Sequence, residues 1–226
     1  MKLIVVYVYA VVSGAKYDDY AFRFLESYNA NPPGVDHETV VVLNGVKQSS
    51  EIACLFSPLP HCTFLERDNS GYDIGAFQHA AREFPCEMMV FFGASTFFFK
   101  TGWLLRMATS FMKHGNALYG AMANRGEPAH GVFPHIRTTA FWCDPKLMNA
   151  CPHKVTSPEQ RYPWEHGANC ITEWVRKQGL TAWEITRNMD LLPRAWGEDP
   201  NGYQRGNQSA LLAGDRMCLP PFYSKR

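Results

Sequence analysis

Short apolar runs alternate with amphipathic stretches over the first part of the chain. The runs at 1–12, 38–45, 62–65, 88–92 and 117–122 are rich in β-branched or aromatic residues, which predicts buried strands. Between them, apolar residues recur at helical spacing and predict three helices. Their apolar faces consist of Ala21, Phe24, Leu25 and Tyr28; of Phe77, Ala80, Ala81 and Phe84; and of Leu104, Leu105, Ala108, Phe111 and Met112. This alternation predicts a three-layer α/β/α arrangement around a mostly parallel sheet.

The regular alternation ends near residue 123. Residues 126–134 form a Gly/Pro/His stretch, typical of a loop, and 136–143 a strand. A short helix is expected from Asp144 to Met148, then a loop over 151–163 that contains three prolines. A helix follows 164–167 and ends at Gly179, and 181–186 predicts the last strand. From Asn188 the chain is mostly polar, which leaves open a tail that folds over a site or a plain surface segment.

The amino-acid composition limits the classes of protein to which the chain can belong. The 226 residues are 46% hydrophobic, which favours one globular domain. The net charge is +1 without a basic run, so we expect a small nucleotide partner and no nucleic acid. Seven cysteines show neither metal-ligand spacing nor a disulfide framework, which favours a reducing, cytoplasmic setting. No stretch reaches the ~20 apolar residues of a membrane helix, although peripheral membrane association stays open.

The most informative stretch is the glycine-punctuated loop at residues 65–77. A strand precedes it and a helix follows, as at nucleotide sites on the carboxyl edge of a parallel sheet. Gly71 and Gly75 permit backbone conformations and close approaches that other residues forbid. Asp73 is the candidate ligand contact. The alternative is a tight turn in which Asp73 only caps the helix.

Three motifs together resemble the rhamnan synthesis protein F group, which is similar to GT-A glycosyltransferases. They are Asn-Ser-Gly-Tyr-Asp-Ile-Gly-Ala at 69–76, Phe-Phe-Gly-Ala-Ser at 91–95 and His-Ile-Arg-Thr-Thr-Ala-Phe at 135–141. The resemblance covers about residues 1–187 and implies a single GT-A-like domain, with a nucleotide-binding half (1–123), an acceptor half (124–187) and a C-terminal tail (188–226). The residues that it implies for nucleotide-sugar binding are Tyr9, Asn69, Gly71, Asp73, Gly75 and Ser95.

The sequence departs from this family at the metal site. Where the family has an acidic pair that holds Mg²⁺ or Mn²⁺ on the diphosphate, this chain has Gly93-Ala94-Ser95-Thr96, and none of these supplies a carboxylate. No metal ligand is therefore predicted, although a divalent metal is not excluded. A metal-free enzyme must neutralise the leaving diphosphate with side chains or helix N-termini. The candidates are Arg137, Lys100, Arg125, His135, Arg187, Arg194 and Arg205.

The resemblance also places a catalytic base at Glu165, at the start of a helix. The alternative is a first-turn acidic residue that the helix dipole favours. His135, Arg137, Trp164 and His166 are the expected contacts to acceptor or phosphate. His135 also has a plain surface interpretation, and Trp164 a core interpretation.

The leading hypothesis is a glycosyltransferase, inverting in mechanism, that moves a sugar from a UDP-, GDP- or dTDP-linked donor to a glycan or glycolipid acceptor in polysaccharide synthesis. The alternative is a catalytically silent homologue that binds nucleotide or glycan. A nicotinamide-dependent oxidoreductase is disfavoured, because Ser13-Gly14-Ala15-Lys16 does not supply the Gly-rich fingerprint after the first strand. Ser95 lacks the context of a hydrolase nucleophile.

Overall fold

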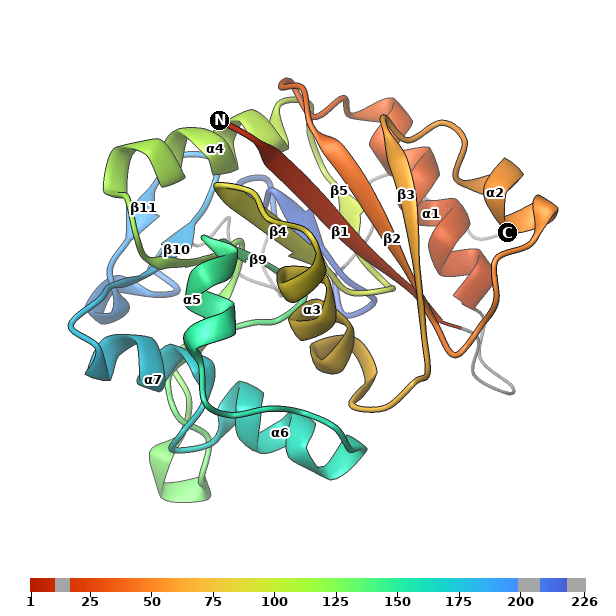
Figure 1. Ribbon diagram of the computed structural model, residues 1–226. Coiled ribbons are helices and arrows are strands. Elements are labelled where there is room, and N and C mark those ends of the chain that lie inside the picture. The colour runs from red at the N-terminus through yellow and green to blue at the C-terminus, as the bar shows by residue number, and fades with distance from the viewer. Residues whose placement is uncertain (11–16, 199–207, 219–226) are drawn as a thin grey trace.

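The computed structural model describes residues 1–10, 17–198 and 208–218, and its centre is an eight-stranded sheet (Figure 1). The strand order is β11-β10-β6-β9-β4-β1-β2-β3. All neighbours pair in parallel except β9, which is antiparallel to β4 and β6, and β11, which is antiparallel to β10. The bounds are β1 Leu3–Ala10, β2 Glu38–Asn44, β3 Cys62–Arg67, β4 Met88–Phe92, β6 Leu118–Gly120, β9 Ala140–Cys143, β10 Ala182–Ile185 and β11 Asp190–Leu191.

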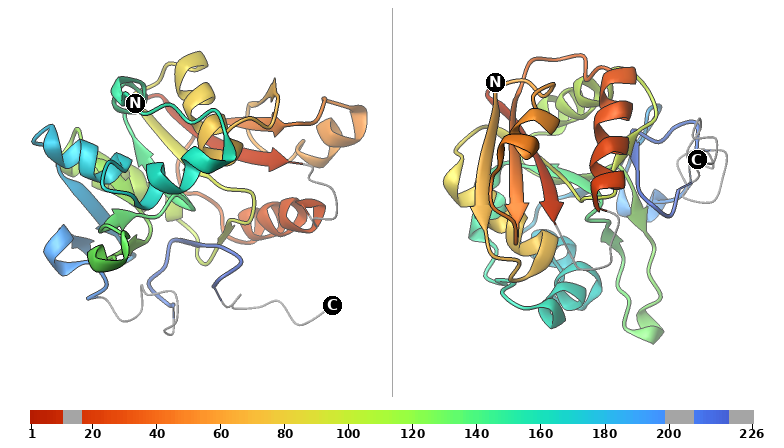
Figure 2. Two further views of the ribbon diagram at one scale, coloured as in Figure 1. Left: turned by 90° about the horizontal axis from the view of Figure 1, so that it is seen from below. Right: turned by 90° about the vertical axis from the view of Figure 1, so that its right-hand side faces the viewer.

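Helices cover both faces of this sheet, which makes three layers (Figures 1 and 2). Alternate side chains of β1 divide the core: Val5 and Tyr7 face the α1 and α4 side, whereas Ile4 and Val6 face the α3 side. The second face also carries α5, α6 and α7. The helices are α1 Tyr17–Ala30, α2 Ser50–Leu55, α3 Tyr72–Glu83, α4 Trp103–His114, α5 Pro145–Ala150, α6 Pro158–His166 and α7 Ile171–Lys177. The predicted α/β class with a mostly parallel sheet is confirmed.

Two short strand pairs and two 3₁₀ turns complete the described structure. β5 (Phe97–Phe98) pairs with β12 (Ala213–Gly214), which attaches the segment after residue 208 to the loop that follows β4. β7 (Ala123–Asn124) pairs with β8 (His135–Ile136), and η1 (Pro128–His130) lies in the loop between them. η2 (Pro193–Ala195) follows β11. The described part of the tail is therefore built into the fold rather than lying free on the surface.

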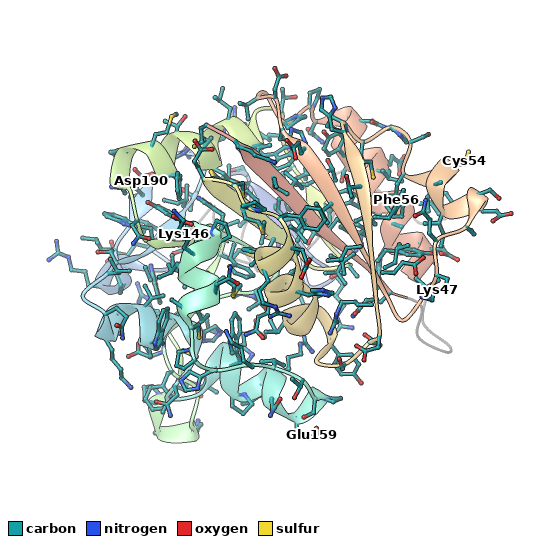
Figure 3. The ribbon with its side chains drawn as sticks, in the orientation of Figure 1. Lys47, Cys54, Phe56, Lys146, Glu159 and Asp190 are labelled. Atoms are coloured by element: carbon teal, nitrogen blue, oxygen red, sulfur yellow. The ribbon has the colours of Figure 1, made fainter. Side chains whose placement is uncertain are left out.

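The edge strand β11 is fixed to α4 by a charge cluster around Asp190 (labelled in Figure 3). The carboxylate contacts Arg106, Lys113 at 2.8 Å and His114 at 2.8 Å. These donors hold the pKa of Asp190 well below its usual range, although burial opposes them. Cys54 and Phe56, labelled on the other side of Figure 3, belong to the α2 region beside β3.

Several sequence predictions need correction. Helix α2 falls in a stretch for which no helix or strand was predicted, and α6 begins in the predicted 151–163 loop. Leu105 and Met112 are 47% and 63% exposed, because the buried stripe of α4 runs through Leu104, Met107 and Ala108 instead. Val11 and Val12 of the first predicted strand lie outside the described residues, as does the Ser13-Gly14 turn.

Gln78 lies on α3 outside the predicted apolar face of that helix, yet its side chain is buried. It is 3% exposed. Its amide donates to the carbonyl of His153 at 2.9 Å and accepts from the backbone N–H of Val155 at 3.0 Å. Both partners belong to the loop between α5 and α6, so α3 is tied to that loop by a buried amide. No helix in the described part of the chain is both long enough and apolar enough to span a membrane.

Candidate functional site

A cavity of about 440 Å³ opens where β1, β2, β3 and β4 reach their carboxyl ends. This is the edge at which open α/β sheets bind ligands. The described residues of the first half contribute mainly uncharged groups, together with Asp73, and the second half contributes most of the charged side chains. The lining residues are Val8, Ala10, Tyr20, Asn44, Asn69, Tyr72, Asp73, Gly93, Ala94, Ser95, Arg137, Thr138, Thr139, Arg161, Glu165, His166, Asp215, Arg216 and Met217.

An amide network forms the floor of this cavity on the β2–β3 side. Asn69 Oδ1 accepts from Asn44 Nδ2 at 2.6 Å, and Asn44 Oδ1 accepts from Arg67 Nη1 at 2.5 Å. Arg67 also donates to the Ser70 carbonyl at 2.6 Å. Asn69 was predicted, whereas Asn44 and Arg67 were not. The available signal was that each ends a strand whose carboxyl end lies at this edge.

The two loop glycines are crowded by the chain itself. Gly71 has φ +69, and a Cβ there would lie 2.2 Å from the carbonyl oxygen of Val155. Gly75 lies inside α3 rather than in the loop, and its Cβ would lie 2.5 Å from the Ser70 carbonyl oxygen. Neither glycine lines the cavity. The close backbone approach that the sequence indicated therefore occurs between segments of the protein, and a nucleotide contact at these two positions stays a prediction.

Asp73 lies in the first turn of α3 and faces the cavity. Gly71 holds the N-cap position, so Asp73 is not the cap residue of the alternative interpretation. Its carboxylate lies 2.9 Å from Arg161 Nε, across the cavity on α6. Burial raises the pKa of Asp73 above its usual range; Arg161 opposes the rise and the charge of Glu165 adds to it. The charge of Asp73 therefore interacts with those of Arg161 and Glu165, which α6 contributes to the cavity lining.

Glu165 lies in the last turn of α6, not at the start of the next helix as predicted. Its Oε1 accepts from the backbone N–H and the hydroxyl of Thr138, at 3.1 and 2.6 Å. Its Oε2 lies 3.2 Å from His166 Nε2. Burial alone would raise the pKa of Glu165, but the contact with His166 and the two bonds from Thr138 outweigh it and lower the pKa to about 2. The helix N-terminus, which the alternative interpretation placed beside Glu165, is not among the causes of this pKa shift.

His166 contacts a second histidine, His135, through its other ring nitrogen. His166 Nδ1 lies 2.8 Å from His135 Nε2, and His135 Nδ1 lies 2.6 Å from the carbonyl oxygen of Phe133. His135 is fully buried, so the surface interpretation is wrong for it, and it does not line the cavity. Burial lowers the pKa of His135, which favours its neutral form. The two histidines are 31 positions apart, so no local sequence pattern indicates that they are in contact.

The tail supplies a carboxylate that the sequence analysis did not select. Asp215 follows β12 and is 6% exposed. It accepts from Thr139 Oγ1 at 2.8 Å and from the backbone N–H of Met217 at 2.8 Å, and Arg137 lies 3.4 Å away. Of the two interpretations of the tail, folding over the site applies to residues 215–217. The one available signal was the apolar run just before Asp215.

Two other predicted residues lie away from the cavity. Tyr9 is 5% exposed and donates to Asp18 Oδ1 at 2.6 Å; burial, reinforced by that bond, raises the pKa of Tyr9 to about 12. Trp164 is 2% exposed and packs in the core beside Phe141, so it offers no face to a sugar and its core interpretation applies. Ser95 does line the cavity, and its carbonyl accepts from Arg23 at 3.0 Å.

Three arginines face the cavity, namely Arg137, Arg161 and Arg216. Arg137 alone was among the predicted phosphate-binding candidates. Arg125 instead contacts the Trp196 carbonyl, and Arg194 lines a separate cavity of about 370 Å³. Lys100 and Arg187 do not line the cavity, and Arg205 lies outside the described residues.

The donor set does not fit a resident divalent cation. Among the described residues, no three His, Cys, Asp or Glu side chains are arranged to hold a metal ion. Each carboxylate that lines the cavity is already engaged: Asp73 with Arg161, Glu165 with Thr138 and Asp215 with Thr139. The loop after β4, Gly93 to Ser95, adds no carboxylate.

Comparisons with known proteins give the fold. No family profile matches the sequence, and no curated protein matches it either, so the rhamnan synthesis resemblance stays a prediction. The structure is similar to S. aureus TarS in complex with UDP-GlcNAc (TM-score 0.50, 16% identity, 71% of this chain and 53% of that one). This chain thus spans about half of the TarS chain. It is also similar to a protein from Bacillus anthracis assigned as a glucose-1-phosphate thymidylyltransferase (TM-score 0.54, 10% identity, 84% and 88% covered). The chain has the α/β fold of the GT-A nucleotide-diphospho-sugar transferases.

Proposed function

We propose that this protein is a glycosyltransferase that uses a nucleoside-diphosphate sugar as donor and a glycan or glycolipid as acceptor. The observation that carries the proposal is the position of Glu165, an oriented carboxylate in the cavity at the carboxyl edge of the sheet. The same cavity holds the Asn44–Asn69 amides on one side and three arginines on the other. The TarS structure, which shares the fold, contains UDP-GlcNAc.

The residues divide into binding and chemical roles. Asn69, Asp73 and the backbone around Ser95 suit the polar groups of a nucleotide, and Arg137, Arg161 and Arg216 suit the charge of its diphosphate. Such donors replace a metal ion in stabilising the leaving group. We infer that donor binding does not require a divalent metal, since the described residues provide no ligand set for one.

Glu165 takes the role of the base in an inverting transfer. As an acceptor hydroxyl attacks the anomeric carbon, the C–O bond to the diphosphate breaks and the hydroxyl proton passes to the carboxylate. A positioned base contributes about 10²–10⁴-fold to such a step. Thr138 holds Oε1 with two hydrogen bonds, which fixes the carboxylate plane. His166 lines the cavity beside it, where an acceptor would enter.

A silent binding protein is the second candidate. The Gly93-Ala94-Ser95 loop, which lacks the carboxylates expected of metal-dependent transferases of this fold, favours it. It would bind the same donor without transferring the sugar. This silent protein would still act in polysaccharide synthesis in the cytoplasm, like the leading candidate.

The first test is nucleotide binding. Thermal-shift titrations with UDP, GDP and dTDP, each with EDTA and with Mn²⁺, should show stabilisation by one nucleotide in both conditions. Saturation at 100 times Kd adds about 2.7 kcal/mol to the free energy of unfolding. Stabilisation only with Mn²⁺ would contradict metal-free binding, and no stabilisation by any nucleotide would contradict the proposed function.

The second test is transfer. Glu165→Gln should lower the transfer rate by at least about 10²-fold and leave donor binding unchanged. Glu159→Gln is the matched control, because Glu159 is an exposed glutamate on the same helix (Figure 3). Wild-type transfer in Glu165→Gln would rule out this base. Donor binding without transfer in the wild type would select the silent candidate.

A further inference from the structure

We propose that Glu165 does not accept the proton alone: Glu165, His166 and His135 form one proton-accepting unit, in which His166 shares the incoming proton with the carboxylate and His135 is the positioning residue that holds His166 in place. The proposal rests on the proposed function, because it concerns the proton released by the acceptor. Its geometric basis is a continuous chain of contacts from the cavity to the buried backbone behind it.

The chain of contacts has three links. Glu165 Oε2 lies 3.2 Å from His166 Nε2, and His166 Nδ1 lies 2.8 Å from His135 Nε2. His135 Nδ1 then lies 2.6 Å from the Phe133 carbonyl oxygen. The backbone holds the two histidines in register, because the N–H of Phe133 donates to the carbonyl of His166 at 2.8 Å.

Both ends of this chain are acceptors only. A carbonyl oxygen has no proton, so His135 must donate from Nδ1, and its Nε2 must then accept from His166 Nδ1. The remaining nitrogen of His166 faces a carboxylate oxygen. Three links therefore need three protons, whereas two neutral imidazoles carry two. The arrangement observed is complete only when the unit holds one extra proton.

This proton count gives the unit two chemical states. With two protons, the carboxylate and two neutral imidazoles carry a net charge of −1, and the link between Oε2 and Nε2 lacks its proton. When the acceptor hydroxyl attacks, its proton enters this link, the unit becomes neutral, and the electron pair of the broken C–O bond leaves with the nucleoside diphosphate. Oε1 already accepts two bonds from Thr138, so Oε2 is the oxygen that receives the proton.

The surrounding charges favour placing the extra proton on the His166 side. Burial disfavours a second proton on His135 by lowering its pKa, and the charge of Arg137 adds to this effect. Asp73 repels the charge of Glu165 and is itself paired with Arg161. The Tyr162 ring packs against His166, with ring centroids 4.6 Å apart. In the described part of the chain, these titratable and charged groups lie near the unit on α3, α6 and the segment around β8.

The unit also resolves a difficulty in the proposed mechanism. A carboxylate with a pKa of about 2 is a poor base at neutral pH, because general-base catalysis is most efficient when the pKa lies near the working pH. In the contact between Oε2 and Nε2 the proton is shared with an imidazole, so its uptake does not depend on the carboxylate alone.

The kinetic test is the pH profile of kcat/KM with the donor and acceptor used for the wild type. We expect the wild-type rate to fall towards acid pH, and the acid limb of His166→Gln to lie at least about 1 pH unit lower, with a rate at pH 7 at least about tenfold reduced. Glutamine keeps an N–H for Oε2 but cannot take a proton. His130→Gln is the matched control, because His130 is exposed and pairs with Glu127 instead. An unchanged acid limb in His166→Gln, or an equal change in His130→Gln, would overturn the proposal while the transferase function stands.

A second measurement needs no transfer activity. Nitrogen NMR of the histidine rings in the full-length protein should show three ring protons on the His135–His166 pair at pH 6, and loss of one of them as pH rises. In Glu165→Gln that loss should occur at least about 1 pH unit lower, a tenfold change in the proton equilibrium. Two ring protons at pH 6 in the wild type, or the same midpoint in both proteins, would overturn the unit. If the wild type neither binds a nucleotide nor transfers, the proposed function fails, and this measurement still decides the proton count.

Discussion

Residues 1–123 and the described residues after 123 build the same cavity in different ways. The first region contributes four parallel strands, β1 to β4, whose carboxyl ends present backbone and the amides of Asn44 and Asn69. The second region contributes short strands, antiparallel β9 and loops, yet it carries Glu165, His166 and the arginines Arg137, Arg161 and Arg216. Among the described residues of the first region, Asp73 is the one charged side chain in the lining.

The first region therefore supplies the scaffold of the cavity, and the second region supplies most of its charged side chains. Strands β1, β2 and β4 are buried on both faces and the edge strand β3 only in part, so packing sets the residues of the first three and leaves their ends for a ligand. The second region covers the open edge and holds its charged groups by hydrogen bonds, such as those from Thr138 to Glu165. The two regions meet where Gly71 passes beneath the carbonyl of Val155. Variants at such junctions test whether the regions depend on each other.

The largest effect is expected at Gly71. Its φ is +69, and a methyl group there would lie 2.2 Å from the Val155 carbonyl oxygen, so either the loop or the α5–α6 segment must move. We expect Gly71→Ala to lower the free energy of unfolding by more than about 3 kcal/mol. Urea unfolding followed by circular dichroism would measure this loss.

Gly131 supplies the matched control for this variant. It has a similar φ of +76, but no atom lies within 4 Å of its Cβ position. Gly131→Ala should therefore cost only the conformational strain, about 1–2 kcal/mol. Equal losses in the two variants would show that backbone strain, not the contact between the regions, explains the effect at Gly71.

The sequence predicted the first region well, because its strands and helices carry strong periodic patterns. Helix α2 was not predicted since it spans six residues and buries none fully. Helix α6 was taken for a loop because Pro163 lies inside it. The available signal was Ser157-Pro158-Glu159-Gln160, a helix start in which the Gln160 side chain accepts from the N–H of Ser157 at 3.2 Å.

Single residues of the candidate site could be selected from the sequence, whereas their contact partners could not. Glu165, Asp73 and Arg137, three of the predicted site residues, line the cavity, and their partners come from distant parts of the chain. Asp215 lies 76 positions from Thr139, and His135 lies 31 from His166. No local pattern encodes such pairs, because they form only after the tail and the α6 segment fold onto the sheet edge.

An intermediate effect is expected from the ionisation of Glu165. Its pKa of about 2 lies below the usual value of 4.5, so the unfolded chain takes up the proton first as pH falls. This contribution to stability is full above about pH 4.5 and is lost as pH falls towards 2. Relative to Glu165→Gln, the wild type should lose about 1–3 kcal/mol between pH 6 and pH 2.5. Urea titrations of both proteins at several pH values would measure it, and parallel curves would contradict the assigned environment of the carboxylate.

The smallest effect is expected for the ion pair that crosses the cavity between the two regions. Asp73 and Arg161 lie 2.9 Å apart, but the Arg161 side chain is 45% exposed, so solvent screens much of the attraction. A double-mutant cycle with Asp73→Asn, Arg161→Gln and the double variant should give a coupling free energy of about 0.5–1 kcal/mol in urea unfolding. Lys47 and Glu66 form a more exposed pair at 2.8 Å within the first region, and their cycle should give a smaller coupling.

The informative step is to repeat the Asp73–Arg161 cycle with a saturating nucleoside diphosphate. If Arg161 binds the diphosphate, the phosphate competes with Asp73 for the guanidinium, and the coupling between the two side chains falls. The coupling between Lys47 and Glu66 has no reason to change, since neither residue lines the cavity. An unchanged Asp73–Arg161 coupling in a nucleotide-bound protein would remove Arg161 from the phosphate-binding set. It would leave the diphosphate to Arg137 and Arg216, and the pair from α3 and α6 would then serve only to hold the two regions together.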